Sequence, residues 1–189
     1  MRAVPAEFTA AVTSLSRPQA RPEVIVETVP APSRLAPHTY AIGAEVLGSA
    51  EDDVLATGRL VLLCDPAGDD AWGSTLRLVT FASAELDPEM ARDPLLAEVG
   101  WSWLTEALDA HDAGYSAVGG TVTQTSSARF GDIAGPAHTL EIELRASWTP
   151  ASGDLSAHLA AWTDVLCTAA GLPPPGVATI ADRATSPAG

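Results

Sequence analysis

The sequence predicts an α+β fold in which helices pack on one mostly antiparallel sheet. Apolar and polar residues alternate from Leu140 to Trp148, as in a strand with one buried face. Apolar residues recur at helical spacing over 95–108 and 155–169, as in helices that lie on a sheet. Strands that follow one another through short connections favour antiparallel pairing.

The first half of the chain is predicted to hold one helix and four strands. Helical spacing of apolar residues over 5–15 predicts the first helix. β-branched or alternating residues predict strands over 24–28 and 40–46. The segment 59–64 is almost continuously apolar, which is typical of a central strand, and 76–86 alternates again.

A loop and the main helix are predicted next. Asp, Pro and Gly predict a loop over 65–70. Either Asp87-Pro88 or Asp93-Pro94 provides the N-terminal signal of the helix, and Gly114 is expected to end it. The residues predicted to form its buried stripe are Leu95, Leu96, Val99, Trp103, Ala107 and Leu108, with Trp101 outside the stripe.

Two strands and a helix complete the predicted domain. A strand is predicted over 121–123, then a loop over 126–136, then the clear strand over 140–148 and the last helix. The order is helix, four strands, helix, two strands, helix (α-β-β-β-β-α-β-β-α), which is similar in element order to small secretion chaperones. Residues 1–172 are predicted to form a single domain, and 173–189 a disordered tail rich in Pro, Ala and Gly.

Charge restricts the classes of partner. Of the 189 residues, 24 are acidic and 10 are basic, which gives a formal net charge of −14, and every basic residue is Arg. Nucleic acids and anionic membranes attract basic proteins, so we expect direct contact with neither. An acidic surface instead favours basic partners and keeps a protein in solution.

Cysteine usage and the start of the chain predict a cytoplasmic location. Cys64 and Cys167 each lie in an apolar segment, so we expect buried, reduced thiols. The first residues lack the charged start and apolar stretch of an export signal, and no apolar run is long enough to span a bilayer.

No catalytic, cofactor-binding or metal-binding motif is recognised in the sequence. The histidines His38, His111, His138 and His158 lie in different predicted elements without ligand spacing. Asp154 stands four residues before His158, a spacing that predicts a surface contact near a helix start. No cysteine has a local His partner, and no glycine loop follows a strand as phosphate binding would require.

Four residues are candidates for binding a partner. Trp101 is either an interface anchor or partly buried against a loop. Arg129 stands beside Phe130 in a predicted loop, and Arg is the usual ligand for carboxylates. Arg145 lies on the polar face of its strand, where an ion pair with a neighbouring strand acid is the alternative to partner binding.

Several stretches resemble one actinobacterial family. They are Leu60 to Gly68, Leu95 to Thr105 with its Trp101-Ser102-Trp103-Leu104, Arg145 to Pro150, Arg21-Pro22-Glu23, Arg34 to Pro37 and Ala170 to Pro173. Together they are similar to domain of unknown function 3000 over roughly residues 5–175. The resemblance implies no catalytic residue, and it implies a link to RNA metabolism.

The leading hypothesis is a non-catalytic adaptor or chaperone-like module, monomeric or homodimeric. It would bind a basic or apolar segment of another protein. One alternative is an enzyme with a small-molecule pocket that no motif marks. Another is an accessory factor of an RNA-processing enzyme that contacts the enzyme and not the RNA.

Overall fold

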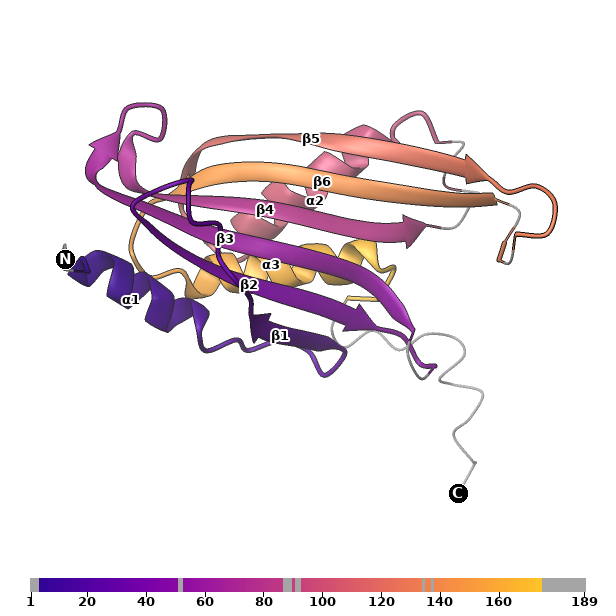
Figure 1. The fold of residues 1–189 in the computed structure, drawn as a ribbon, viewed down its shortest axis with the longest axis horizontal. Helices are drawn as coiled ribbons and strands as arrows, with labels where there is room; N and C mark the ends of the chain where they lie inside the picture. Colours follow the sequence, from indigo (N-terminus) through magenta and orange to yellow (C-terminus); the bar gives the residue numbers. More distant parts are fainter. Residues whose placement is uncertain are drawn as a thin grey trace, which may run out of the picture.

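A computed structural model of the protein describes residues 4–50, 53–86, 90, 93–133, 135–136 and 138–174. The elements are α1 (Ala6–Leu15), β1 (Val24–Thr28), β2 (His38–Leu47), β3 (Val54–Asp69), β4 (Ser74–Leu86), α2 (Leu96–Ala110), β5 (Tyr115–Ala128), β6 (His138–Pro150) and α3 (Ser156–Ala169). This order confirms the predicted α+β fold (Figure 1).

All six strands form one antiparallel sheet, in the order β1-β2-β3-β4-β6-β5. The first four strands follow one another as hairpins. Helix α2 then carries the chain from β4 to the far edge, where β5 begins, and β6 returns between β4 and β5. The strands at the two edges of the sheet are therefore β1 and β5.

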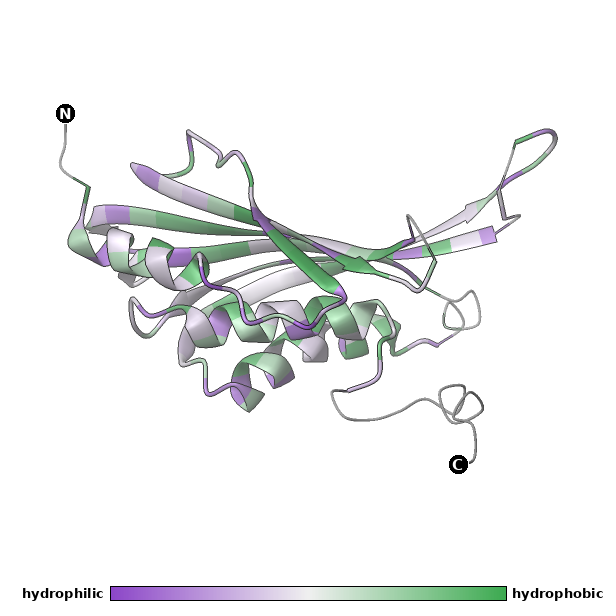
Figure 2. Ribbon diagram, turned by 90° about the horizontal axis from the view of Figure 1, so that it is seen from below, coloured by the Kyte–Doolittle hydropathy of each residue, from purple (hydrophilic) through white to green (hydrophobic). Residues whose placement is uncertain are grey.

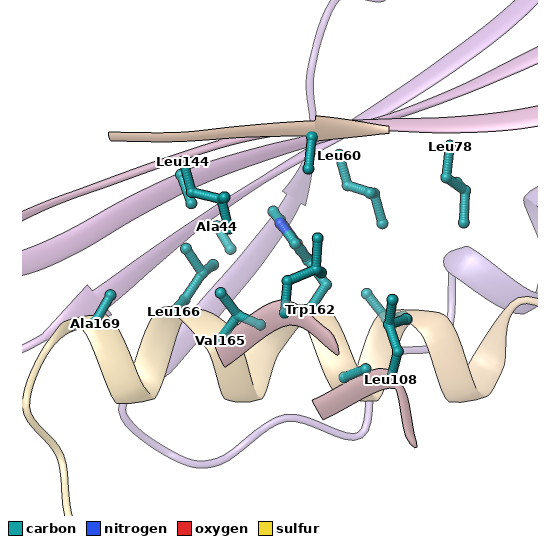
Figure 3. Packing of buried hydrophobic residues seen from close by; sticks show 14 of the residues in the cluster. Ala44, Leu60, Leu78, Leu108, Leu144, Trp162, Val165, Leu166 and Ala169 are labelled. Atoms are coloured by element: carbon teal, nitrogen blue, oxygen red, sulfur yellow. The ribbon is translucent and has the colours of Figure 1, made fainter. Parts of the chain in front are cut away.

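The core lies between the sheet and the helices, which gather on one side of the sheet (Figure 2). Alternation turns Leu60, Leu78 and Leu144 toward α3, where they meet Trp162 and Leu166 (Figure 3). All five side chains are at most 5% exposed. Full burial of each leucine contributes about 2 kcal/mol, so this layer is the main stabilising contact of the fold.

The opposite side of the sheet, which we call the open face, is covered only in part. Ala41, Val61 and Leu63 are buried there beneath a small cluster that includes Val29 and Trp72. Beyond that cluster the face continues over β4, β6 and β5. The side chains that define this uncovered part are Phe81, Ser83, Glu85, Glu141, Glu143, Arg145, Thr121, Thr123 and Thr125.

Two predicted loops are wrong in part because strands run through them. Strand β3 extends to Asp69, through the predicted loop over 65–70, since Asp69 still pairs with Ser74 across an irregular register. Strand β5 covers 115–128 instead of 121–123, and so takes the first residues of the predicted loop over 126–136. Both faces of most of β5 are exposed, so it has no hydrophobic alternation by which a sequence reveals a strand.

Helix α2 differs from its prediction at its ends and along its stripe. It ends at Ala110 rather than Gly114. Of the two predicted N-terminal signals, Asp87-Pro88 lies outside the described residues. At the other, Asp93 Oδ1 accepts a hydrogen bond from the Leu95 amide at 2.9 Å. Leu95 and Val99 are 53% and 39% exposed. The residues buried on the helix are Leu96, Gly100, Leu104 and Leu108.

Gly100 explains the shifted stripe. A Cβ at this position would lie 2.8 Å from Ile142 Cδ1, so the glycine lets α2 approach β6 closely. Because glycine has no side chain, a search for apolar residues at helical spacing overlooks Gly100 and assigns Val99 to the buried stripe instead. The helix is therefore rotated relative to the predicted stripe.

Residues near the C-terminus remain in contact with the domain up to Pro173, whose carbonyl oxygen accepts a hydrogen bond from Arg21 Nη1 at 2.7 Å. The predicted tail over 173–189 lies outside the described residues from 175 onward. Among the described helices, none has the length and hydropathy needed to cross a bilayer.

Candidate partner-binding surface

Arg145 lies on β6, the middle strand of the uncovered part of the open face. Strand register places it directly opposite Phe81 on β4 and Thr121 on β5. Its guanidinium carbon lies 5.3 Å from the centroid of the Phe81 ring, and its Nη2 donates to Glu143 Oε2 at 3.2 Å. A cation over an aromatic ring and an ion pair within one strand hold the side chain in place. With 65% of the side chain exposed, its guanidinium remains accessible to a partner.

Two carboxylates face each other on the same face, four residues along β6 from this arginine. Glu85 on β4 and Glu141 on β6 are direct partners in the strand register, and both residues are exposed. Glu141 accepts a hydrogen bond from the Ser83 hydroxyl at 2.6 Å. Within the described part of the chain, neither carboxylate forms a salt bridge. Like charges directly opposite on neighbouring strands repel, so this pair favours a cation from outside the chain.

A shallow depression of about 340 Å³ lies over the same part of the sheet. Strands β3, β4, β5 and β6 all contribute to it, and Glu85, Glu141 and Arg129 lie on its walls. Its lining includes no His or Lys. Among the described lining residues, Ser83 donates its hydroxyl to Glu141, and the groups offered to a ligand are hydroxyls, carboxylates and the Arg129 guanidinium.

The connection from β5 to β6 presents large apolar side chains to solvent. Phe130 is 80% exposed and Ile133 is 65% exposed. Arg129 Nη1 donates to the Pro136 carbonyl oxygen at 3.0 Å, so the arginine bridges the two ends of this connection. Gly135 has φ +112°, a conformation that glycine alone adopts easily, and a Cβ there would meet the Arg129 guanidinium.

Trp101 lies away from the other three candidates. It belongs to α2, on the helix side of the sheet, where it is partly buried and packs against the core. The structure therefore brings Arg129 and Phe130 together at one end of β5, places Arg145 on the face beside that strand, and separates Trp101 from all three.

Titratable groups elsewhere form structural contacts. Burial raises the pKa of both the Cys64 and Cys167 thiols, which keeps them protonated and poorly nucleophilic. His111 Nε2 lies 2.6 Å from Asp164 Oδ2, which ties the end of α2 to α3. Among the described residues, no three His, Cys, Asp or Glu side chains gather as a metal site would require.

His158 is a buried residue that sequence reasoning placed at the surface. The residue is 2% exposed, and its Nδ1 accepts a hydrogen bond from Trp148 Nε1 at 3.1 Å. The prediction that His158 and Asp154 form a surface contact is therefore wrong, because His158 is buried. Asp154 instead accepts hydrogen bonds from the Ser156 amide at 3.0 Å and hydroxyl at 2.7 Å, at the start of α3.

The comparisons with known proteins give one match. The family model described as Protein of unknown function (DUF3000) matches residues 4–178, which confirms the resemblance to domain of unknown function 3000. No curated protein and no solved structure matches the chain.

Proposed function

We propose that this chain, which belongs to the family described as Protein of unknown function (DUF3000), is a non-catalytic module that binds a segment of a partner protein. The observation that carries the proposal is the exposure of Phe130 and Ile133, at 80% and 65%, on the connection that follows Arg129, a residue lining the depression on the open face. Aromatic side chains next to a polar rim are typical anchors of protein interfaces.

The surroundings of these side chains support protein binding over other functions. The depression on the open face is shallow and polar, and its chemistry is recognition of charge. The net charge of −14 disfavours direct contact with nucleic acid and anionic membranes, but it attracts basic protein segments. The partner would therefore combine apolar contacts at Phe130 with basic groups over the sheet.

A site-specific crosslinking experiment tests this function. A photo-crosslinking phenylalanine analogue replaces Phe130 in the full chain, and the matched control carries the same analogue at Thr13, an exposed residue of α1. After irradiation in a native lysate, we expect a discrete adduct with a protein at position 130 and none at position 13. The same adducts at both positions, or none at position 130, would refute the proposal.

A second variant separates binding from folding. Because the Phe130 side chain is 80% exposed, Phe130→Ala is expected to change the free energy of unfolding by less than about 0.5 kcal/mol. The purified variant should nevertheless fail to compete with the crosslinking form for the partner, whereas wild-type protein should compete. Equal competition by both proteins would show that Phe130 is no anchor.

A further inference from the structure

We infer that the free edge of β5 is the docking site for an extended, basic segment of the partner, which adds a strand to the sheet. The inference rests on the proposed function, because it specifies how the partner binds and what its chemistry is. It starts from the topology, in which β6 is the one neighbour of β5 among the described strands.

Beyond the irregular register at Ser116 to Gly119, the edge of β5 lacks the charges and prolines that usually prevent strand pairing. Residues 119–128 contain no charged residue and no proline, and they include the β-branched Thr121, Thr123 and Thr125. The other edge strand, β1, has five residues and carries the exposed Glu27. Edge strands that must stay single are short, charged or interrupted by proline, so β5 is the edge suited to accept another strand.

Both sides of β5 leave space for an added strand. On the open face its side chains are small threonines. On the other face Val122 lies against α2, where a Cβ on Gly100 would be 3.4 Å from Val122 Cγ1. Helix α2 thus supports the strand from beneath, while no other described strand pairs with the outer edge of β5. Every second residue of such a strand offers its N–H and C=O to a neighbour.

Most charges around β5 are acidic, which favours a basic segment; the two basic exceptions are Arg129 at the end of the strand and Arg145 opposite Thr121. The region 93–128, which includes α2 and β5, has no Lys or Arg, and its acidic residues are Asp93, Glu98, Glu106, Asp109 and Asp112. On the open face, Thr125, Glu141 and Glu85 form one row across β5, β6 and β4. A side chain opposite Thr125 would start roughly 10 Å from Glu141, two strand spacings away.

Long basic side chains fit this row better than any other type. A Lys or Arg can extend across the small Thr125 side chain toward the Glu85 and Glu141 carboxylates, which repel each other in the free protein. A second basic side chain opposite Thr123 would approach Glu143, two residues along the strand. The expected partner strand therefore carries basic residues at alternate positions.

A second copy of this chain is the less suitable occupant. Pairing β5 with β5 would bring together two chains that each carry a net charge of −14. It would also place the acidic α2 helices on the same side of one continuous sheet. Charge complementarity favours a basic segment from another protein.

Peptide binding to the full chain tests the inference. The probe is a fluorescent peptide of alternating Thr and Lys, long enough to pair with residues 119–128, and its affinity is measured by fluorescence anisotropy. Two control peptides carry alternating Thr and Glu, or the same Thr and Lys residues in two separate blocks. We expect the alternating Lys peptide to bind at least about tenfold more tightly than either control.

Proline variants test main-chain pairing. Thr123→Pro and Gln124→Pro affect neighbouring residues, one of which pairs with β6 while the other faces the free edge. Circular dichroism and thermal unfolding identify the variant that keeps the fold. That variant should bind the peptide about tenfold more weakly, because it lacks one edge N–H and blocks close approach. If both proline variants unfold, Thr123→Lys replaces them. This variant keeps the backbone N–H groups and repels the lysines of the peptide, so it should also weaken binding about tenfold.

Charge variants test the basic side chains. The double variant Glu85→Gln and Glu141→Gln should weaken binding by about threefold to tenfold. The matched control, Glu27→Gln and Glu45→Gln, removes the same charge from exposed residues on β1 and β2 and should leave binding unchanged. Equal effects of the two double variants would overturn the inference.

The outcomes also separate this inference from the proposed function. A partner crosslinked at Phe130 together with unchanged peptide affinity in the folded proline variant would refute strand addition and leave the binding function standing. A dimer in light scattering that the same proline variant dissociates would also refute it, since a second copy would then occupy β5. No crosslinked partner at all would refute the function itself.

Discussion

His158 is a buried residue whose protonation depends on its surroundings. Burial lowers its pKa from 6.5 to about 4, although Asp154 acts in the opposite direction. The neutral ring accepts the hydrogen bond from Trp148 Nε1, so the native state requires an unprotonated Nδ1. The histidine is thus a structural part of the contact between β6 and α3.

The lowered pKa makes stability depend on pH in a defined window. Above pH 6.5 the imidazole is neutral in both the native and the unfolded state. As the pH falls from 6.5 to about 4, only the unfolded state gains the proton, so the free energy of unfolding decreases by about 3 kcal/mol. His158→Asn should lack this component, while the exposed His138→Asn should keep it. Urea unfolding from pH 4 to pH 7 measures the difference, and parallel profiles for wild type and His158→Asn would contradict it.

Thr80 is the second buried polar residue on which the core depends. Its hydroxyl accepts a hydrogen bond from Trp162 Nε1 at 2.8 Å and donates to the Arg59 carbonyl oxygen at 3.0 Å. Thr80→Val keeps the shape but leaves the buried Trp162 Nε1 without its acceptor, so it should destabilise the protein by about 1–3 kcal/mol. Thr121→Val, on exposed β5, should change stability by less than about 0.5 kcal/mol. Similar urea midpoints for the two variants would show that the Trp162 hydrogen bond contributes little.

At the scale of elements, β5 is held against β6 by a close backbone approach. A Cβ on Gly120 would meet the Arg145 carbonyl oxygen, and would lie 2.9 Å from both Cα and Cβ of Ala146. At Gly119, the next residue, nothing lies within 4 Å of an added Cβ. These two glycines are therefore neighbours in sequence with opposite tolerance for a side chain.

This difference gives a matched pair of variants. Gly120→Ala should destabilise the protein by about 1–3 kcal/mol, because backbone atoms must shift to admit the methyl group. Gly119→Ala should be tolerated without loss of stability. Thermal unfolding of both variants measures the effect. A lower midpoint for Gly119→Ala than for Gly120→Ala would contradict the register of β5 on β6.

Elements with one buried face could be predicted from the sequence, and β5 could not. Leu140, Ile142 and Leu144 are at most 5% exposed, as their alternation predicts, because burial selects apolar residues at every second position. Strand β5 is exposed on both faces over most of its length, so no such selection acts on its residues. Gly100 similarly shifts the face of α2, because the contact there depends on a missing side chain.

For the candidate surface, the sequence predicts individual residues but not the contacts between them. Local sequence singled out Arg129, Phe130 and Arg145 as exposed polar or aromatic positions. The stacking of Arg145 on Phe81 and the opposition of Glu85 and Glu141 both depend on β6 lying next to β4. The two strands are neighbours because the chain crosses through α2 to β5 before β6 returns beside β4. No local sequence pattern indicates this strand order.

At the scale of the whole molecule, the two faces of the sheet differ. One face is closed by α2 and α3 and holds the core, whereas part of the open face and the edge of β5 are uncovered among the described residues. The acidic balance of the chain adds a long-range attraction for basic segments. We therefore expect peptide affinity to decrease as sodium chloride increases, because salt screens exposed charges.

Hydrogen exchange of the full chain, with and without the alternating Thr and Lys peptide, tests the central claim most directly. Edge amides of a strand exchange faster when they face solvent than when they pair with a neighbour. At saturating peptide we expect slower exchange over 115–128, and unchanged exchange in α1 and α3. Protection confined to the helices, or an unchanged β5 at saturation, would contradict the claim that β5 is the docking edge.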